Sequence, residues 1–351
     1  FCGFALFGEQ GLRLTGQSEG LVVNGGRVVA ISGYSLPFAL LFVVSASFLE
    51  GIKRPMPGVI FLLIANIVNI FLNWVMIYGN WGAPIMGAEG AVWATNICRF
   101  LLAISIVAYI WWMRDHDKYG VRKKDTGGWQ NWKKQREIGY ASGLTVGVES
   151  IAFNGLGVLA GWMGVLAIGA HAIVMNVLIF IAMISIGIGS ATAIQVGFAT
   201  GKEDIHAVRR SGWTGFWLTV FVVGLISFFL LSNPQWFASL YTSDSALMDV
   251  VVPAIFMLGI VVVFDGTQLV MSFALRGRGE TWIISAMNFL AFIIILVPVS
   301  WWLSIKLNHG ILGLYEAVLL SCVAATGLFA GYFWYLTRRD TKGRTRTGKQ
   351  Y

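Results

Sequence analysis

The chain has 351 residues, of which 57% are hydrophobic and only 12% are charged, and its mean hydropathy is +0.72. Soluble domains contain about 25% charged residues, so this composition excludes an ordinary soluble protein and indicates one that crosses a membrane several times. The net charge of +8 could suggest binding to nucleic acid. The distribution of that charge along the chain, described below, instead indicates one side of a membrane, and we expect no nucleic-acid partner.

Long apolar segments follow one another along the whole chain. Each is long enough to cross a hydrocarbon core of about 30 Å at a helical rise of about 1.5 Å per residue. The first residues, Phe1–Phe7, look like the end of a further span. The pattern predicts an all-α, polytopic membrane bundle with nine spans at 21–49, 56–78, 90–113, 138–165, 168–198, 212–232, 246–275, 281–305 and 311–336.

Basic residues are concentrated in alternate connections between these spans. Of the 25 Lys and Arg residues, 21 lie in one alternating set and only three lie in the other, with Arg99 inside a span. Positively charged loops remain on the cytoplasmic side of membranes. The sequence therefore predicts a cytoplasmic C-terminus, in a basic tail at residues 338–351.

The longest connection, residues 114–137, is polar, basic and contains glycine. It predicts a cytoplasmic linker between a partial first lobe at residues 1–113 and a second lobe at 138–337. Within it, Asp115-His116-Asp117 could suggest a metal site, but the spacing matches no known ligand set. We interpret this run as a solvated charge cluster.

Two short signatures occur on both sides of the linker. Phe48–Gly51 (FLEG) and Ala274–Gly277 (ALRG) are 226 residues apart, and a Gly-x-x-Gly-x-x-x-Ala pattern begins at Gly87 and again at Gly310. The similar offsets predict two parallel structural repeats. Three spans precede the linker and six follow it, so a six-helix repeat predicts three further helices, or roughly 90 residues, upstream of this chain.

Two carboxylates lie deep in apolar spans of the second lobe. Glu149 occurs in SGLTVGVESIAFN, and Asp265 occurs in GIVVVFDGTQLVMSF. An ionised carboxylate in mid-membrane costs about 2.5 to 3.5 kcal/mol, so such residues face protein, water or a cation. Two acids at similar depth favour a shared cation or proton site. The alternative is that each acid is structural and held by neighbouring hydrogen-bond donors.

The first lobe has neutral polar residues in place of deep carboxylates. Asn66, Asn69 and Asn73 recur at spacings of three and four and share one helix face, and Thr95 on the next span could add a hydroxyl. Amide oxygens can bind a small cation, but helix–helix hydrogen bonding is an equally good interpretation. We interpret His171 as structural.

Chemistry-bearing motifs of other kinds are missing from the sequence. It contains no phosphate-binding loop, nucleophile elbow or His/Cys metal spacing. We therefore expect neither an enzyme nor an ATP-driven pump, and no cofactor.

Several stretches together resemble the multidrug and toxic compound extrusion (MATE) transporters, most closely their NorM-type branch. They occur in family order across almost the whole chain: FLEGIKRPMPG, VNIFLNWVMIYG, MGAEGAVWAT, GVESIAFN, GAHAIVMN, GIGSATAIQVG and FDGTQLVMSFALRG. The resemblance implies two lobes of six helices around a central cavity, with helices 4 to 12 present in this chain.

The resemblance also implies roles for individual residues. Glu149 and Asp265 match the acidic pair of the second-lobe cation site, and Asn69, Asn73 and Thr95 match the first-lobe polar site. The essential aspartate of that first-lobe site, which lies on the first helix of the family, does not occur in this sequence. Two further positions depart from the pattern: a proline is replaced within GYASGLT, and a tyrosine one turn before the second acid is Val261.

The function implied is antiport coupled to H⁺ or Na⁺, exporting organic, cationic drugs by alternating access. The expected setting is the bacterial inner membrane, where the protein would act as a monomer in the lipid bilayer. A flippase for lipid-linked precursors is the alternative from the same superfamily. An ion channel is the alternative from another class, and an intramembrane enzyme is disfavoured because no nucleophile and base stand out.

Overall fold

A computed structural model describes residues 19–123 and 129–347, and within them all regular secondary structure is helical. Nine helical segments in these ranges are long and apolar enough to cross a membrane. The predictions of an all-helical fold and of nine spans are therefore confirmed for the part of the chain described. The predicted span end at Phe1–Phe7 lies outside it.

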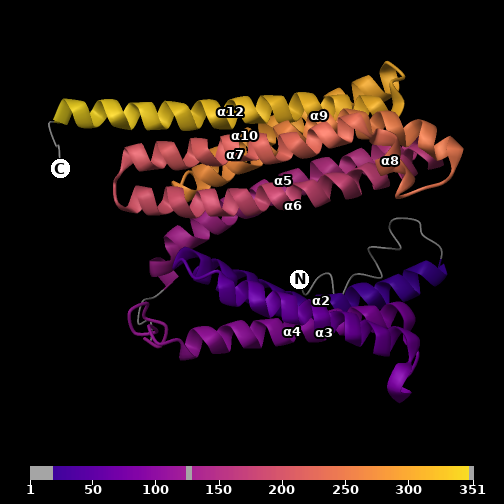
Figure 1. Cartoon of the computed structure of the whole chain (residues 1–351), viewed down its shortest axis with the longest axis horizontal. Helices are drawn as coiled ribbons and strands as arrows, with labels where there is room; N and C mark the ends of the chain where they lie inside the picture. The colour runs from indigo at the N-terminus through magenta and orange to yellow at the C-terminus, as the bar shows by residue number, and fades with distance from the viewer. Residues whose placement is uncertain (1–18, 124–128, 348–351) are drawn as a thin grey trace. The chain divides into compact units, whose positions relative to one another are not determined.

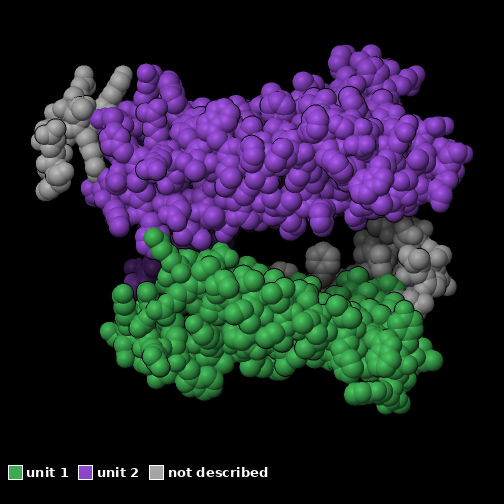
Figure 2. Space-filling view, viewed as in Figure 1, with its two compact units in different colours: residues 1–126 green, residues 127–351 purple. Residues whose placement is uncertain are grey.

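The chain divides into two compact units, residues 1–126 and 127–351 (Figure 2). The division falls within the segment predicted as a linker, residues 114–137. Unit 1 contains α2 (Glu19–Gly51), α3 (Met56–Tyr78), η1 (Asn80–Gly82) and α4 (Gly87–Trp112). Unit 2 contains η2 (Trp129–Trp132), α5 (Lys133–Trp162), α6 (Val165–Gly201), α7 (Ile205–Ser232), α8 (Pro234–Ser239), α9 (Ser245–Gly277), α10 (Thr281–Asn288), η3 (Phe289–Leu296), α11 (Val297–Trp301), η4 (Trp302–Lys306) and α12 (Gly310–Thr347).

The helix boundaries follow the predicted spans closely, and the largest difference at a helix start is in α7. Hydropathy placed its start at residue 212, whereas the helix begins at Ile205. Asp204 caps this end, because its side chain accepts a hydrogen bond from the backbone N–H of Ala207 at 3.0 Å. The first turns contain Arg209 and Arg210, so they are helical without being apolar.

In unit 1, α4 packs against both α2 and α3 (Figure 1). Asn96 on α4 donates its amide to the carbonyl of Ile31 on α2 at 2.7 Å, and Arg99 donates to the Ser35 hydroxyl at 2.9 Å. The second bond gives Arg99, a basic residue inside a predicted span, a polar partner on the neighbouring helix. Such interhelical hydrogen bonds stabilise helix pairs where water is scarce.

In unit 2, α9 is the central helix and packs against α6, α7 and α12 (Figure 1). Glycines on α9 let the neighbouring backbones come close. A Cβ added at Gly266 would lie 2.7 Å from the Ser185 Oγ of α6, and one added at Gly277 would lie 2.3 Å from the carbonyl oxygen of Ala193. Small residues at helix contacts are typical of membrane bundles, because packing is the main attraction between their helices.

The span predicted at residues 281–305 is not a uniform α-helix. It passes from α10 into the π-helical segment η3, then through α11 and the π-helical segment η4. Pro298 lies just after η3 and has no N–H to donate, so the regular i to i−4 ladder loses a hydrogen bond there. The widened turns begin directly after Asn288, a residue of the candidate site described below.

The repeated sequence signatures occupy matching structural positions. The helices α2 and α9 end at Gly51 and Gly277, the final glycines of the first signature. The second signature opens α4 and α12 with glycines of positive φ, +53° at Gly87 and +58° at Gly310. This agreement supports the two parallel repeats inferred from the sequence.

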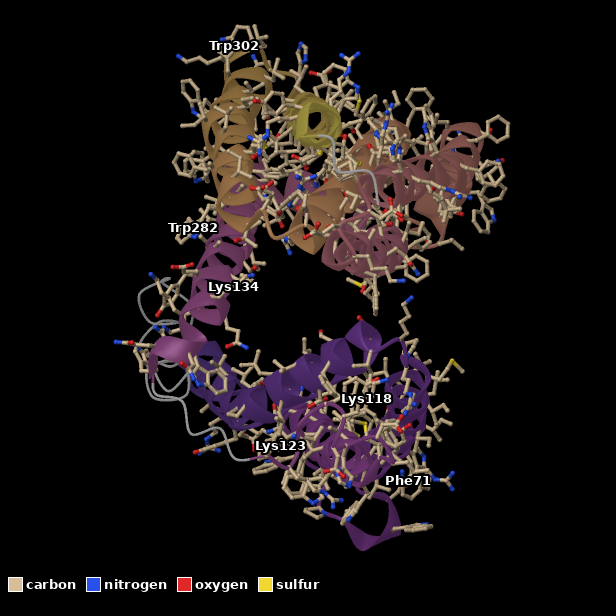
Figure 3. The ribbon with its side chains drawn as sticks, turned by 90° about the vertical axis from the view of Figure 1, so that its left-hand side faces the viewer. Phe71, Lys118, Lys123, Lys134, Trp282 and Trp302 are labelled. Atoms are coloured by element: carbon tan, nitrogen blue, oxygen red, sulfur yellow. The ribbon has the colours of Figure 1, made fainter. Side chains whose placement is uncertain are left out.

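The outer faces of both units are apolar, as expected for helices that contact lipid. Figure 3 shows Trp282 and Trp302 at the outer surface of unit 2 and Phe71 at the surface of unit 1. Trp282 and Trp302 lie towards opposite ends of the same span, where indole rings anchor helices at the two membrane interfaces.

Candidate functional site

Glu149 and Asp265 line one cavity of about 480 Å³ that lies entirely within unit 2. Glu149 comes from α5 and Asp265 from the central helix α9. Both side chains are among the residues that line this cavity. The structure thus brings together the two acids that the sequence analysis singled out.

Glu149 is half-buried and is held by an amide from another helix. The Nδ2 of Asn288, the last residue of α10, donates to Glu149 Oε1 at 2.7 Å. Asn288 itself is fully buried. A hydrogen bond to an ionised acceptor is stronger than one between neutral groups, so Asn288 fixes the position of this carboxylate.

Two further polar contacts align α5 with α10. The hydroxyls of Thr145 and Ser285 are 2.8 Å apart, and Ser285 also donates to the carbonyl of Ala141 at 2.7 Å. Residues 141, 145 and 149 recur every four positions and so share one face of α5. The polar contacts between α5 and α10 therefore run along this one face of α5, and Glu149 makes the one nearest the C-terminal end of α10.

Asp265 is almost completely buried, with 6% of its surface exposed. Its Oδ1 accepts a hydrogen bond from Nε2 of Gln268 at 3.4 Å, and the thiol of Cys322 on α12 approaches the same oxygen at 3.8 Å. Gln268 is one helical turn from Asp265 on α9 and also lines the cavity. Both carboxylates of the site are thus held by a buried carboxamide.

A basic side chain also lies within electrostatic range of Glu149. Arg276 is eleven residues, or three helical turns, after Asp265, so both residues occupy nearly the same face of α9. Arg276 interacts electrostatically with Glu149, and its guanidinium lies 5.4 Å from the centre of the Phe273 ring. Its positive charge therefore lies within electrostatic range of Glu149, although Arg276 is not one of the residues that line the cavity.

The rest of the cavity wall is mainly apolar and includes flexible side chains. Phe153 of α5 and Phe292 of η3 are in ring contact at 5.8 Å, and Met175 and Met183 come from α6. Methionine adapts its shape to different partners more easily than branched side chains do. A carboxylate pair beside such a wall can hold the charged end and the apolar body of one molecule.

The sequence analysis identified the two acids but not the groups that hold them. Gln268 could have been found, because it follows Asp265 by three residues and so lies on the same helix face. Asn288 is an isolated polar residue in an apolar run, and its partner is 139 residues away. No local spacing indicated that contact.

The polar residues predicted in unit 1 are partly brought together. Asn73 donates to Asn69 Oδ1 at 3.0 Å, which agrees with their predicted common face. Thr95 instead donates to its own helix, at the Ala91 carbonyl, 3.0 Å away. Asn69 interacts with the side chain of Cys98, one turn from Thr95, so it links α3 to α4.

Other residues considered in the sequence have structural partners. His171 is buried, and its Nδ1 lies 3.2 Å from the Tyr315 hydroxyl, which agrees with a structural role. Asp115 pairs with Arg54 at 2.5 Å, and the side chain of Asp117 is largely exposed. These contacts favour a solvated charge cluster over a metal site.

Comparison with known proteins gives the family of the chain. The family model described as MatE matches residues 2–75 and 141–302. The chain is 32% identical over 338 residues to the probable multidrug resistance protein NorM of Caulobacter vibrioides, which covers 96% of this chain and 72% of that protein. It is 28% identical over 263 residues to the probable multidrug resistance protein NorM of Photorhabdus laumondii, covering 74% of this chain but only 57% of that relative.

The fold agrees with this relationship. The crystal structure of a eukaryotic MATE transporter, AtDTX14, superposes with a TM-score of 0.86 at 18% identity, covering 97% of this chain and 76% of that one. The nine membrane-length helices in the described residues and these likenesses define a multi-pass membrane protein with a transporter fold. The chain belongs to the MatE family, and the relatives it matches are NorM proteins.

Proposed function

We propose that this protein is a cation-coupled multidrug antiporter, which exports organic cations in exchange for H⁺ or Na⁺. The observation that carries the proposal is the position of Glu149 and Asp265 on one partly apolar cavity. The names of the NorM relatives, which describe multidrug resistance proteins, support the substrate class.

Electrostatics explains how one cavity could exchange two kinds of cation. Two nearby carboxylates repel each other when both are ionised, and any bound positive charge relieves that repulsion. A proton, a sodium ion and an organic cation would therefore compete for the same oxygens. A ligand shifts a transporter between conformations only through different affinities for them, and a site whose charge changes with its load supplies such a difference.

The cavity wall suits the apolar part of an organic cation. Phe153 and Phe292 offer ring surface, and Met175 and Met183 can adapt to molecules of different shape. A site that recognises charge and apolar surface, with few directional polar contacts, favours a broad substrate range. The polar group of unit 1, Asn69, Asn73 and Thr95, would be a second and weaker cation site, because neutral oxygens hold a cation less strongly than carboxylates.

The expected orientation follows from the charged connections. We infer a cytoplasmic C-terminus in a bacterial inner membrane, since 21 of the 25 Lys and Arg residues lie in one alternating set of connections. Arg276 and the basic α12 end would then lie towards the cytoplasm. We further expect a monomer to be the transporting unit, because both acids of the site come from one chain.

The test is efflux of a fluorescent organic cation from proteoliposomes, driven by an imposed H⁺ or Na⁺ gradient. Glu149→Gln and Asp265→Asn keep the side-chain shape but remove the charge, so each should reduce gradient-driven efflux at least tenfold. Glu137→Gln changes an exposed carboxylate on the same helix as Glu149 and should retain the wild-type rate. Wild-type efflux in both cavity variants would show that these acids are structural, and flux without counterflow would indicate a channel.

A further inference from the structure

The helices α6 and α7 of unit 2 lie side by side (Figure 1), and a groove of about 540 Å³ runs along their contact. This α6–α7 groove shares none of its described lining residues with the acidic cavity. Thr192 and Gly215 form its floor, and they are packed so closely that a Cβ added at Gly215 would lie 2.2 Å from the Thr192 Oγ1. The floor of the groove is therefore fixed by helix packing.

The two ends of the α6–α7 groove differ in chemistry. At one end the lining residues are polar: Gln195, Arg210, Ser211 and Thr214. At the other end they are apolar or lack a side chain: Gly187, Ile188, Ala191 and Leu218. Arg210 and Leu218 are eight residues apart on α7, and Gln195 and Gly187 are eight residues apart on α6, so the apolar end lies about 12 Å further along both helices.

The polar end of the groove lies near one surface of the membrane. Arg210 is the sixth residue of α7, and Gln195 is six residues before the end of α6 at Gly201. The apolar span predicted from hydropathy begins only at residue 212, after Arg210 and Ser211. The polar end is therefore at the level of the lipid headgroups, and the apolar end is within the hydrocarbon core.

The positive charge of Arg210 is not balanced by the protein. The ion pairs found among the described residues involve other basic side chains, and no described carboxylate lines the α6–α7 groove. A second cavity at the same end of unit 2 shows the contrast. Its lining includes Arg278 and Arg339 but also Glu203 and Asp340, and Arg278 pairs with Asp340. The α6–α7 groove alone of these two has an excess of positive charge.

Hydrogen-bond donors also remain available at the polar end. The hydroxyls of Thr192 and Thr219 donate to the carbonyl four residues earlier, at 2.8 and 2.9 Å. Ser211 and Thr214, by contrast, make no hydrogen bond with another described residue. A cation beside hydroxyl and amide donors is a set that suits phosphate oxygens, and a guanidinium matches their geometry particularly well.

We propose that the α6–α7 groove binds one anionic phospholipid, with its phosphate at Arg210 and an acyl chain along the apolar end. A free phosphate would use only the polar end, whereas a phospholipid at this depth fills both. The unbalanced charge favours a headgroup with a net negative charge, because a zwitterionic headgroup would bring a second positive charge to Arg210. This inference depends neither on the substrate nor on the coupling ion of the proposed antiport.

The first experiment tests the charge. Native mass spectrometry of the purified chain in detergent measures the affinity of the first bound phosphatidylglycerol. Arg210→Gln removes the charge but keeps an amide donor, and it should weaken binding at least fivefold. Arg209→Gln removes the neighbouring exposed charge, which does not line the groove, and should bind within twofold of wild type. Phosphatidylcholine, which has no net charge, should bind the wild-type chain at least fivefold more weakly than phosphatidylglycerol.

The second experiment tests the acyl-chain end of the groove with the same measurement. A Cβ at Gly187 meets no atom within 4 Å, so Gly187→Leu should fill the apolar end without disturbing the helices, and it should weaken phosphatidylglycerol binding at least fivefold at an unchanged melting temperature. Gly224→Leu makes the same change on α7, at a position that also meets no atom within 4 Å but lies outside the groove. It should bind within twofold of wild type.

Three results would overturn the inference. They are equal binding by Arg210→Gln and Arg209→Gln, equal binding by Gly187→Leu and Gly224→Leu, and equal affinity of the wild-type chain for the two lipids. The efflux of the Glu149 and Asp265 variants tests the proposed function separately, so either result can fail without the other.

Discussion

Asn288 of α10 donates its amide to the Glu149 carboxylate of α5 over 2.7 Å, although the two residues are 139 positions apart in the chain. The bond lies at the point where α10 changes into the π-helical segment η3. It connects the acid that we propose binds the coupling cation to a helix whose regular hydrogen bonding is interrupted one residue later. A change in the charge of Glu149 would therefore change the strength of this hydrogen bond, directly beside the irregular segment, where a helix bends more easily.

The first prediction concerns the polar contact that aligns α5 with α10. Ser285→Ala removes the hydrogen bonds from Ser285 to Thr145 and to the Ala141 carbonyl. We expect a loss of about 0.6 kcal/mol of stability, the average for such bonds between membrane helices, with efflux within twofold of wild type. Thermal unfolding in detergent would measure the change.

The matched control is Ser239→Ala, because among the described residues this exposed serine bonds only within its own helix, to the carbonyl of Trp236. Its melting temperature should remain that of wild type. Equal melting temperatures for all three proteins would mean that the Thr145–Ser285 contact does not stabilise the α5 to α10 packing.

The second prediction tests the close helix contact made by the repeated glycine signature. A Cβ at Gly313 would lie 2.8 Å from the backbone of Leu303 and Ser304, which cannot move aside as a flexible side chain could. Gly313→Ala should therefore destabilise unit 2 by about 1 to 3 kcal/mol, the usual cost of overpacking. A Cβ at Gly327 meets no atom within 4 Å, so Gly327→Ala on the same helix should be neutral or slightly stabilising. Fluorescence-detected size-exclusion chromatography after heating would compare them, and equal losses would contradict the packing argument.

Gly313 also shows how much of the fold the sequence could predict. The spans, their order and the repeat depend on hydropathy and on short glycine patterns, which are local properties of the chain. The signature that begins at Gly87 and at Gly310 was recognised as a repeat from the sequence alone. The structure adds the physical reason for glycine at these positions, which is a positive φ at the first glycine and a close backbone contact three residues later. The π-helical turns around Pro298 were not predicted, because hydropathy does not distinguish a π-helix from an α-helix.

The candidate site was predictable only in part for a similar reason. A carboxylate in an apolar run stands out in any sequence, so Glu149 and Asp265 were found directly. Asn288 and Cys322 reach the two acids from distant helices, and such contacts depend on tertiary packing. Thr95 was predicted as a hydroxyl that could join Asn69 and Asn73. Its hydroxyl donates to the carbonyl of Ala91, as hydroxyls inside helices can do, and its part in a cation site stays a prediction.

The third prediction concerns the polar group of unit 1. Asn73→Ala removes the hydrogen bond to Asn69 but no charge. We expect it to reduce gradient-driven efflux by less than threefold, because a neutral oxygen contributes less to holding a cation than a carboxylate does. The same proteoliposome assay would rank it against Asp265→Asn. If Asn73→Ala lost as much gradient-driven efflux as Asp265→Asn, the result would indicate that the main coupling site lies in unit 1.

The last prediction concerns the orientation of the helices in the membrane. Ser243 lies between α8 and α9, and Gln130 lies in η2, before α5; both are exposed, and the three spans α5, α6 and α7 separate them. An odd number of crossings places them on opposite sides, and the basic residues near Gln130 assign it to the cytoplasm. We expect a cysteine at Ser243 to react with a membrane-impermeant maleimide in intact cells, and one at Gln130 to react only after permeabilisation. Both variants are made in the chain with Cys2→Ser, which gives the background, since Cys98 and Cys322 are buried and contribute little. Labelling of both positions from the same side would refute the arrangement of spans, and labelling with the two sides exchanged would refute the cytoplasmic C-terminus.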